Sequence, residues 1–323
     1  MRASTGVLVF TLLSGTASAH VGTGLDVDAR GNICFSDTIH NRIVRVSSTG
    51  RSEIVARDVH TNAVACGEDG SVYFGDGDSV WGRAPHREAR KLFKASILRK
   101  GLGEPLAIDS SGNSYFASGR EILRITPAGF VSKWTRLASA TPIRGGVLAA
   151  SGVLYVKSGA TISRVERGGA LTRLAGGKVA GVGGLIDSPV WRQRTLGIAV
   201  DADGGVYIAN HRFHRVYRVG PTKTSAIFKS SFPWTPVAVA TIGTDVVLLE
   251  RPGNPYGPSF VLGKRIGRHR VWRIAPDGKA TLVAVVGRPS LTQRIEEKTA
   301  EMCLRAKRTA AAYLVRLLRW SVV

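Results

Sequence analysis

A strand–turn–strand phrase recurs six times along this chain of 323 residues, at a spacing close to 40 residues. Each copy has a glycine suited to a tight turn, and a short run of β-branched and aromatic residues follows it. A period of this size with several short strands is the sequence signature of a β-propeller. The glycines are Gly31, Gly70, Gly112, Gly152, Gly204 and Gly243, at intervals of 39, 42, 40, 52 and 39 residues.

The fifth period shows how one blade is encoded. An apolar run at 196–200 leads into a turn at 201–204, and residues 206–208 form a second strand. A third strand of pattern Ile/Val-x-Arg-Val/Ile follows, and a fourth comes after another glycine turn. Four antiparallel strands per period predict an all-β, six-bladed propeller in one domain at 20–287. We expect the third-strand arginines to form a solvated belt around the ring: Arg45, Arg124, Arg164, Arg218 and Arg273.

The first period resembles an NHL repeat. Residues 24–46 read GLDVDARGNICFSDTIHNRIVRV, and residues 197–219 are similar. The glycine-rich stretch 175–188 is similar to the connector that precedes blades in bacterial NHL proteins. The resemblance covers residues 22–287 and implies a propeller of NHL type, within the wider gluconolactonase/senescence-marker-like group. That group includes sensors, scaffolds, RNA binders, lactonases and lyases, so the resemblance implies a fold and no single activity.

The N-terminus supports two interpretations. Residues 1–19 have the charged, apolar and small-residue parts of a secretory signal, ending in Ala17-Ser18-Ala19. Alternatively, residues 4–13 form an outer strand that closes the ring against the last blade. The last blade, however, has an outer strand of its own at 280–286.

The C-terminal tail, residues 288–323, departs from the β pattern. A capping box at 290–293 precedes helix-forming residues, so we expect a short C-terminal helix. The tail has eight Lys or Arg against three Glu, a net charge of +5. This predicts either a basic amphipathic helix that rests on an anionic membrane or a solvated extension. No run in the tail is long and uncharged enough to span a bilayer.

The whole chain is strongly basic, with 45 Lys and Arg against 23 Asp and Glu and a formal charge of +22. A basic surface can neutralise phosphates and release counterions. The repeat arginines are spread around the ring, however, and no cluster of aromatic residues accompanies them. Nucleic-acid binding typically uses one basic face, so we do not expect nucleic acid as the partner. RNA binding through basic loops is kept as the second alternative function.

One face of the ring is expected to carry the function. Propeller strands alternate in direction, so the turns between second and third strands and the connections between blades emerge on the same side, where binding residues concentrate. A connector at 176–195 and an insertion at 251–270 lie there. We expect a protein or small-molecule ligand to bind between them on a few aromatic and basic anchors. The expected binding residues are Trp191, Trp234, Tyr256, Arg144, Lys264, Arg265 and Arg268.

A metal-dependent enzyme is the alternative. Glu104 before Pro105 resembles the Glu-Pro entry of the lactonase group, and Asn62 offers a second oxygen ligand for a hard cation. No Asp begins the remaining blades, so this ligand set is incomplete and no cofactor is expected. Ca²⁺, Mg²⁺ or Zn²⁺ belongs to the alternative alone. The weak catalytic candidates are Glu104, His60, His211 and His214, and the weak metal candidates are Glu104 and Asn62.

Histidine can serve as an acid, a base or a metal ligand, so the His211 and His214 pair has two interpretations. Their segment, 210–215, aligns with 37–42 of the first period, where we expect Asp37 and an asparagine to bond to the turn. His40 and His214 are therefore predicted to be structural residues of the turn.

The three cysteines, Cys34, Cys66 and Cys303, give an odd count. Cys34 stands in the second-strand position that tyrosines fill in blades 2 to 5, which indicates core packing, and Cys66 lies in the first strand of blade 2. We therefore predict buried, unreactive thiols. Their spacing does not match a zinc site.

Together these patterns favour a monomeric propeller that acts as a scaffold or sensor, by binding rather than by catalysis. Removal of residues 1–19 places it outside the cell or in the periplasm or envelope, and their retention places it in the cytoplasm. A lactonase- or lyase-like metal enzyme is the first alternative.

Overall fold

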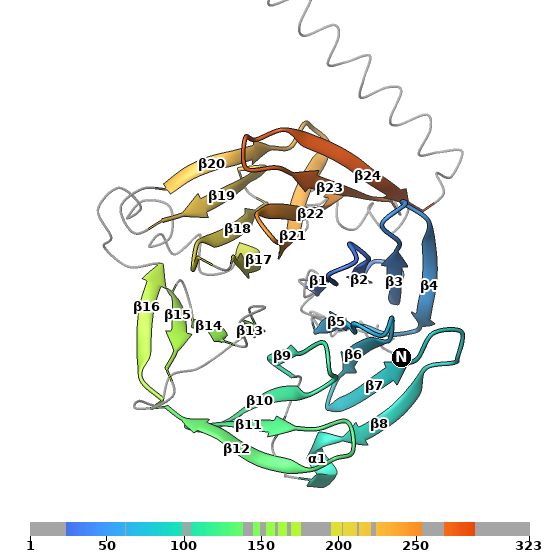
Figure 1. Ribbon diagram of the computed structural model, residues 1–323, viewed down its shortest axis with the longest axis vertical. Coiled ribbons are helices and arrows are strands. Elements are labelled where there is room, and N and C mark those ends of the chain that lie inside the picture. Colours follow the sequence, from blue (N-terminus) through green and yellow to red (C-terminus); the bar gives the residue numbers. More distant parts are fainter. Residues whose placement is uncertain are drawn as a thin grey trace, which may run out of the picture.

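The chain forms a ring of six antiparallel sheets, as the repeat predicts (Figure 1). Each sheet has four strands in chain order, with the first near the axis and the fourth at the rim. The fold is an all-β, six-bladed propeller. The computed structural model describes residues 24–61, 63–98, 102, 105–137, 145–148, 153–158, 161–166, 169–175, 195–201, 203–211, 213–220, 224–253 and 268–287.

The strands follow the predicted periods. Blades 1 to 3 contain β1 (Leu25–Val27), β2 (Ile33–Asp37), β3 (Arg42–Val46) and β4 (Ser52–Arg57); β5 (Val64–Cys66), β6 (Val72–Asp76), β7 (Ser79–Arg83) and β8 (Arg90–Lys94); and β9 (Ala107–Ile108), β10 (Ser114–Ser118), β11 (Glu121–Ile125) and β12 (Val131–Arg136). Blades 4 to 6 contain β13 (Gly145–Leu148), β14 (Leu154–Ser158), β15 (Thr161–Val165) and β16 (Leu171–Ala175); β17 (Thr195–Val200), β18 (Val206–Asn210), β19 (Arg215–Val219) and β20 (Thr224–Lys229); and β21 (Trp234–Ile242), β22 (Asp245–Pro252), β23 (His269–Ile274) and β24 (Ala280–Val286). A single turn of helix, α1 (Ala95–Leu98), connects blades 2 and 3.

The sixth sheet is built from its own period. Its outer strand is β24, as the sequence predicts, and all four of its strands follow one another along the chain. The ring-closing interpretation of residues 4–13 lies outside the described residues, as do the signal peptide at 1–19 and the helix expected in 288–323.

The ring has two distinct faces. We call the side with the β2–β3-type turns and the connections between blades the loop face. The opposite side, with the β1–β2-type and β3–β4-type turns, is the turn face. Aspartates hold turns on this second face: Asp28 Oδ1 accepts hydrogen bonds from the N–H groups of Arg30 and Asn32 at 2.9 and 2.8 Å. Asp109 and Asp201 repeat this arrangement in blades 3 and 5.

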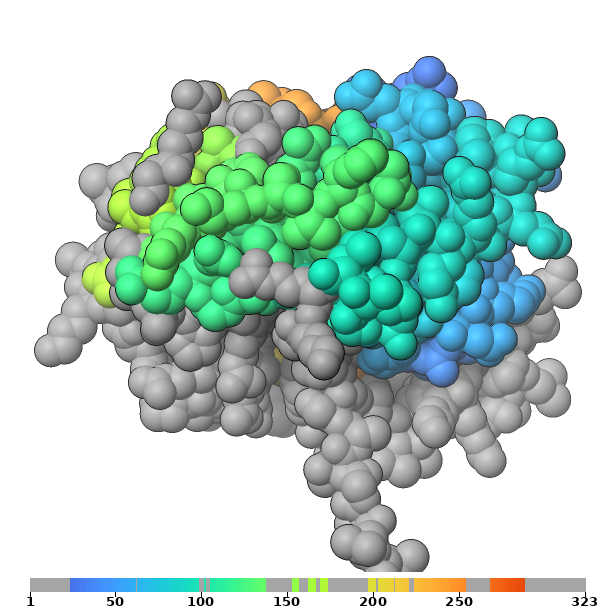
Figure 2. Space-filling model, turned by 90° about the horizontal axis from the view of Figure 1, so that it is seen from below, coloured from blue at the N-terminus to red at the C-terminus, as the bar shows by residue number. Residues whose placement is uncertain are grey.

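The hydrophobic core lies in the seams between neighbouring blades. In the seam between blades 6 and 1, Phe35 and Val44 pack with Leu249 and Val271, and each is at most 1% exposed. Complete burial of such a side chain contributes about 1.5–3 kcal/mol relative to exposure. At the rim the outer parts of blades 2 and 3 adjoin, teal beside green in Figure 2. Burial on both faces explains why inner strands such as β2 and β18 are rich in apolar residues, whereas the outer strands β4, β8, β12 and β20 are half-buried or exposed at most positions and include polar and charged residues.

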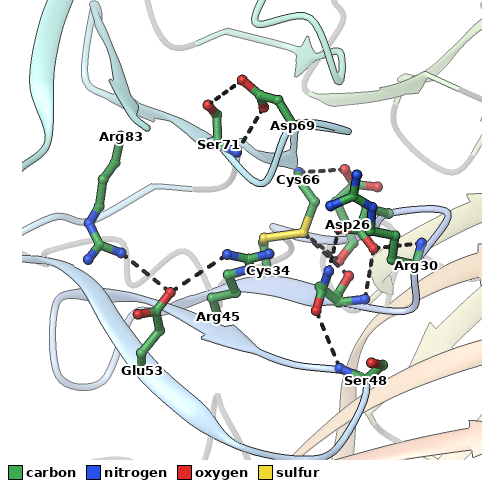
Figure 3. The surroundings of a disulfide bond; sticks show 12 residues. Asp26, Arg30, Cys34, Arg45, Ser48, Glu53, Cys66, Asp69, Ser71 and Arg83 are labelled. Atoms are coloured by element: carbon green, nitrogen blue, oxygen red, sulfur yellow. Dashed lines mark hydrogen bonds and ion pairs between the residues drawn. A yellow bond between two sulfur atoms is a disulfide. The ribbon is translucent and has the colours of Figure 1, made fainter. Parts of the chain in front are cut away.

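Two of the cysteines form a disulfide, so the prediction of free buried thiols is wrong (Figure 3). Cys34 in β2 bonds to Cys66 in β5, with the Cα atoms 5.7 Å apart. Both residues are buried as predicted, at 0% and 2% exposure. The second strand of blade 1 faces the first strand of blade 2 across the seam, and this contact between blades is what the sequence interpretation missed. Cys303 lies outside the described residues.

The solvated belt of repeat arginines is confirmed in part, since the side chains of Arg164, Arg218 and Arg273 are 47%, 45% and 52% exposed. The Arg45 side chain is 21% exposed, and its Nη1 lies 3.9 Å from Glu53 Oε1, which Arg83 of blade 2 approaches to 3.5 Å (Figure 3). Arg218 Nε donates a 3.1 Å hydrogen bond to the Tyr207 hydroxyl. The guanidinium groups of Arg45 and Arg218 therefore serve the packing of the blades, since each occupies a seam or covers a ring beside one.

Candidate binding site on the loop face

The structure describes five of the residues predicted to bind or react: His60, His211, His214, Trp234 and Arg268. They are not all brought together. His60 lies in the connection between blades 1 and 2, where its Nδ1 is 3.3 Å from Asn41 Oδ1. The other four belong to blades 5 and 6. The remaining predicted residues lie outside the described residues: Asn62, Glu104, Arg144, Trp191, Tyr256, Lys264 and Arg265.

The β18–β19 turn of blade 5 is fixed by its own polar groups. Asn210 Oδ1 accepts a 3.1 Å hydrogen bond from the N–H of Phe213. His214 has a positive φ of 51°, and its Nδ1 donates to the carbonyl oxygen of Trp234 at 2.7 Å. The N–H of Ser230 donates to the carbonyl oxygen of His214 at 2.8 Å, which joins this turn to the connection between blades 5 and 6. His214 is thus the structural turn residue that its alignment predicts, and His211 is 2% exposed.

Two phenylalanines stand exposed on these joined segments. Phe213 in the β18–β19 turn is 41% exposed, and Phe232 in the connection between blades 5 and 6 is 68% exposed. Leaving a phenyl ring in water forgoes the free energy of its burial, so exposed aromatic side chains grouped on a loop face indicate a contact surface.

Trp234, a predicted anchor, is not exposed. Its side chain is 3% exposed, and the guanidinium carbon of Arg270 lies 3.8 Å from the ring centroid. A cation over a tryptophan ring at this distance contributes about 0.5–2 kcal/mol, depending on desolvation. If Trp234 contributes to binding, it therefore does so only indirectly, because it holds the Arg270 side chain in place.

A buried acid lies beside this stack. Glu250 at the loop-face end of β22 is 1% exposed, and its Oε2 accepts a 2.6 Å hydrogen bond from Trp272 Nε1. Burial is the largest influence on Glu250 and raises its pKa, although Trp272, Arg270 and His214 all act in the opposite direction. Arg270 is thus held between an aromatic ring and the field of a carboxylate.

A second polar group fills the loop-face end of the seam between blades 6 and 1. Asp37 is fully buried and accepts 2.7 Å hydrogen bonds from His40 Nδ1 and Arg42 Nε. Burial by itself raises the pKa of Asp37, but the electrostatic interaction with His269, which is protonated only at low pH, and the bonds from His40 and Arg42 outweigh it and hold the pKa well below its usual range.

His269, at the start of β23, faces this carboxylate from blade 6. Its Nδ1 lies 3.8 Å from Asp37 Oδ2, and its ring lies 5.4 Å from that of Phe35 between centroids. Complete burial is the largest cause that lowers the pKa of His269 to about 4, and nearby Arg251 lowers it further while Asp37 opposes. The imidazole is therefore neutral at neutral pH.

In blades 5 and 6 the acidic and the basic residues lie mostly on opposite faces of the ring. Apart from Glu250, the described acids of these blades all lie in turns or at a strand end on the turn face: Asp201, Asp203, Asp245 and Asp277. The loop-face ends of β19, β20 and β23 have basic residues instead: Arg215, Lys229, Arg268 and Arg270. The described loop face of blades 5 and 6 is therefore positively charged around its exposed phenyl rings.

The described residues do not test the prediction of a metal-dependent enzyme. Among the described residues, no three His, Cys, Asp or Glu side chains come together as a metal-binding group. Glu104 and Asn62 lie outside those residues, so a metal-dependent activity stays a prediction. The same described part of the chain includes no helix with the length and apolar character needed to cross a bilayer.

The sequence matches no protein-family model and no curated protein. Solved structures are similar in fold. A chain of a nidogen/laminin complex is 14% identical, with a TM-score of 0.52 over 79% of this chain and 97% of the other. Regucalcin from Agrobacterium tumefaciens, a calcium-binding protein, is 15% identical, with a TM-score of 0.51 over 77% and 88%. Virginiamycin B lyase from Staphylococcus aureus is 15% identical, with a TM-score of 0.47 over 85% and 86%. At these identities the likeness shows the fold alone.

Sequence reasoning missed four residues of this site: Phe213, Phe232, Glu250 and Arg270. Two of them had a readable signal, because Phe213 and Phe232 are aromatic residues within polar turn segments. Glu250 and Arg270 had none. Their roles depend on which side of blade 6 each side chain faces, and the irregular strand ends conceal this in the sequence.

Proposed function

We propose that this propeller is a non-catalytic binding protein that holds an acidic partner segment with apolar side chains on the loop face of blades 5 and 6. One observation supports it above the others: Phe213 and Phe232 are exposed at 41% and 68% on segments that hydrogen bonds join. Aromatic anchors surrounded by polar groups are typical of the centre of a binding surface.

The local structure favours a site that exists before binding. Asn210 fixes the backbone at Phe213, and His214 ties this turn to residues 230–234. Because the rings are held on a fixed backbone, little conformational freedom is lost when a partner docks, and less of the interaction energy is spent on ordering.

The surrounding charge favours an acidic partner. Arg215, Lys229 and Arg270 stand at the loop-face ends of β19, β20 and β23, whereas the described exposed acids of these blades lie on the turn face. Complementary charge increases the association rate and its effect weakens with salt. The predicted anchors Trp191 and Tyr256 belong to segments that flank this region in the sequence, and they enlarge the surface in this proposal.

The proposal includes an NHL-type repeat and export from the cytoplasm. The NHL type is supported by the motifs at 24–46 and 197–219, and export by the Cys34–Cys66 disulfide, since disulfides persist mainly in oxidising compartments.

The test compares two acidic probes of matched length, polyglutamate and a glutamate–tyrosine copolymer, by fluorescence anisotropy at several salt concentrations. We expect the copolymer to bind at least tenfold more tightly than polyglutamate. Phe213→Ala and Phe232→Ala remove that difference because they remove the apolar contacts. Phe130→Ala is the matched control, since Phe130 is 74% exposed but lies in the β11–β12 turn on the opposite face.

Equal binding of both probes by all variants would show that only the net charge of +22 attracts them, and it would sink the proposal. Loss of the difference in Phe130→Ala as well would place the contact elsewhere on the ring and would equally overturn the proposal. Circular dichroism of each variant establishes that the fold is intact, as expected for exposed side chains.

A further inference from the structure

One position of the repeat changes its residue in blade 6. One residue near the start of each second strand faces the following blade, and it pairs across the sheet with the third-strand arginine or its equivalent. In blades 2 to 5 the residue is tyrosine, in blade 1 it is the cysteine of the disulfide, and in blade 6 it is valine. The six residues are Cys34, Tyr73, Tyr115, Tyr155, Tyr207 and Val247.

The tyrosines fill the seams at the turn face. The Tyr73 ring lies so close to Gly112 of blade 3 that a Cβ atom on this glycine would be 2.6 Å from the ring. Tyr115 and Tyr207 pack in the same way into the seams that follow blades 3 and 5, where they are 6% exposed. In these seams a tyrosine ring therefore fills the space next to the turn glycine of the following blade.

In the seam between blades 6 and 1 this space is open. A pocket of about 200 Å³ lies there on the turn face, between Val247 of blade 6 and Gly31, the turn glycine of blade 1. Its walls combine apolar residues, among them Val27, Ile33 and Val283, with the polar residues Arg30, Ser48 and Arg273. Blades 2 to 5 have a tyrosine side chain at this place, whereas Val247 has no ring. The pocket therefore occupies the space that a tyrosine ring fills in the other seams.

Arg273 is oriented as an anion-binding group. It is the cross-strand neighbour of Val247, and its Nε donates a hydrogen bond to Asp245 Oδ2. Arg218 in the same position of blade 5 instead donates its Nε to the hydroxyl of Tyr207 and covers that ring. The cross-strand neighbour Val247 gives Arg273 no ring to cover, and the Arg273 side chain is 52% exposed. A guanidinium group held through Nε keeps its two terminal nitrogens for a carboxylate, which it can bind in bidentate fashion.

We infer that this pocket is a ligand site for a small aromatic carboxylate. The aromatic ring of the ligand occupies the space that tyrosine fills in blades 2 to 5, and the carboxylate binds the terminal nitrogens of Arg273. An apolar cavity of about 150 Å³ accepts benzene in another protein, so the pocket is large enough for one such ring. This site lies on the opposite face from the proposed partner surface and does not depend on it.

The test uses benzoate and its neutral analogue benzyl alcohol, with binding to the full chain measured by isothermal titration calorimetry. We expect benzoate to bind at least tenfold more tightly than benzyl alcohol. Val247→Tyr restores the residue of the repeat, fills the pocket and abolishes binding of both probes. Arg273→Gln weakens benzoate at least tenfold and leaves benzyl alcohol unchanged. Arg218→Gln is the matched control, since it removes an arginine from the same position of a blade whose seam is filled.

Three results would overturn the inference: no benzoate binding to the unaltered chain, equal benzoate binding by Val247→Tyr, or an equal loss in Arg218→Gln and Arg273→Gln. Val247→Tyr is expected to unfold at the same temperature or higher, because it fills a cavity with the side chain used in four other blades. If that variant does not fold, Arg273→Gln decides alone, since its half-exposed side chain is replaced without a change in the core.

Discussion

Cys34 and Cys66 join the second strand of blade 1 to the first strand of blade 2, at a seam position where four other blades have a tyrosine. The covalent bond thus replaces an aromatic contact between blades. It closes a segment with a sequence separation of 32 residues. Such a crosslink lowers the conformational entropy of the unfolded chain.

Removing this disulfide should destabilise the propeller. We expect the double variant Cys34→Ser, Cys66→Ser to lose about 3 kcal/mol of unfolding free energy, as is common for a native disulfide. Chemical denaturation of the oxidised protein and of the double variant, each with and without reductant, measures this loss. Cys303→Ser is the control and should change nothing. Alkylation of the unfolded, unreduced chain should modify one of its three cysteines, and modification of all three would contradict the bond.

Asp26→Asn should stabilise the protein at neutral pH. Asp26 Oδ2 accepts a 2.8 Å hydrogen bond from the N–H of Cys66, and burial raises the pKa of Asp26 to about 6 (Figure 3). Folding therefore favours the protonated acid, and the folded state becomes less stable as the pH rises from about 4 to about 6. The neutral amide escapes this cost and can still accept the hydrogen bond. We expect a gain of up to about 3 kcal/mol at pH 7.5 and no gain at pH 3.5. Equal effects at both pH values would refute the prediction.

His269→Gln should reduce the loss of unfolding free energy that occurs as the pH falls below neutrality. The pKa of His269 falls from 6.5 to about 4 on burial, so the unfolded chain takes up a proton in this range while the folded chain does not. The histidine therefore costs stability as the pH falls from 6.5 to 4. The variant lacks this group, so its unfolding free energy should fall up to about 3 kcal/mol less over that interval. Urea unfolding of both proteins at pH 7.5 and pH 4 tests it, and parallel profiles would contradict it.

Gly112→Ala should cost more than Gly204→Ala. Both glycines have nearly the same positive φ, 80° and 81°, so both alanines suffer the same backbone strain. Only at Gly112 would the new Cβ meet a ring, 2.6 Å from Tyr73, whereas nothing lies within 4 Å at Gly204. We expect a difference of about 1–3 kcal/mol in thermal or chemical unfolding. In a Tyr73→Val background the two substitutions should cost the same, and a persisting difference would exclude the ring as its cause.

The sequence predicts the ring but not the contacts between its blades. Four strands per period and the outer strand at 280–286 follow from local chemistry, and the structure confirms them, together with a positive φ at the five turn glycines that it describes. Contacts across a seam join residues whose relative placement the repeat does not encode. The Cys34–Cys66 bond crosses between two blades in this way. The stacking of Arg270 on Trp234 lies within blade 6, but it joins the first and third strands, which are not neighbours in the sheet. The belt of arginines is solvated only in part for the same reason, since Arg45 approaches the same Glu53 carboxylate as Arg83 of the next blade.

Departures from the repeat proved to be the most informative signals for sites. Val247 differs from the tyrosines of blades 2 to 5, and the pocket opens beside it. Cys34 differs at the same position, and it forms the disulfide. Both differences are visible in the sequence, but their meaning required the distance to the neighbouring blade.

The order of the strands also has a mechanical consequence. Because β21–β24 complete blade 6 from a single period, the six blades follow one another along the chain, and within the described residues between 24 and 287 no chain connection crosses the seam between blades 6 and 1. Packing around Phe35 and Leu249 holds that seam, with no described covalent connection across it. A force that pulls blade 1 and blade 6 in opposite directions would therefore separate these two blades first. The other five junctions would remain linked by the backbone.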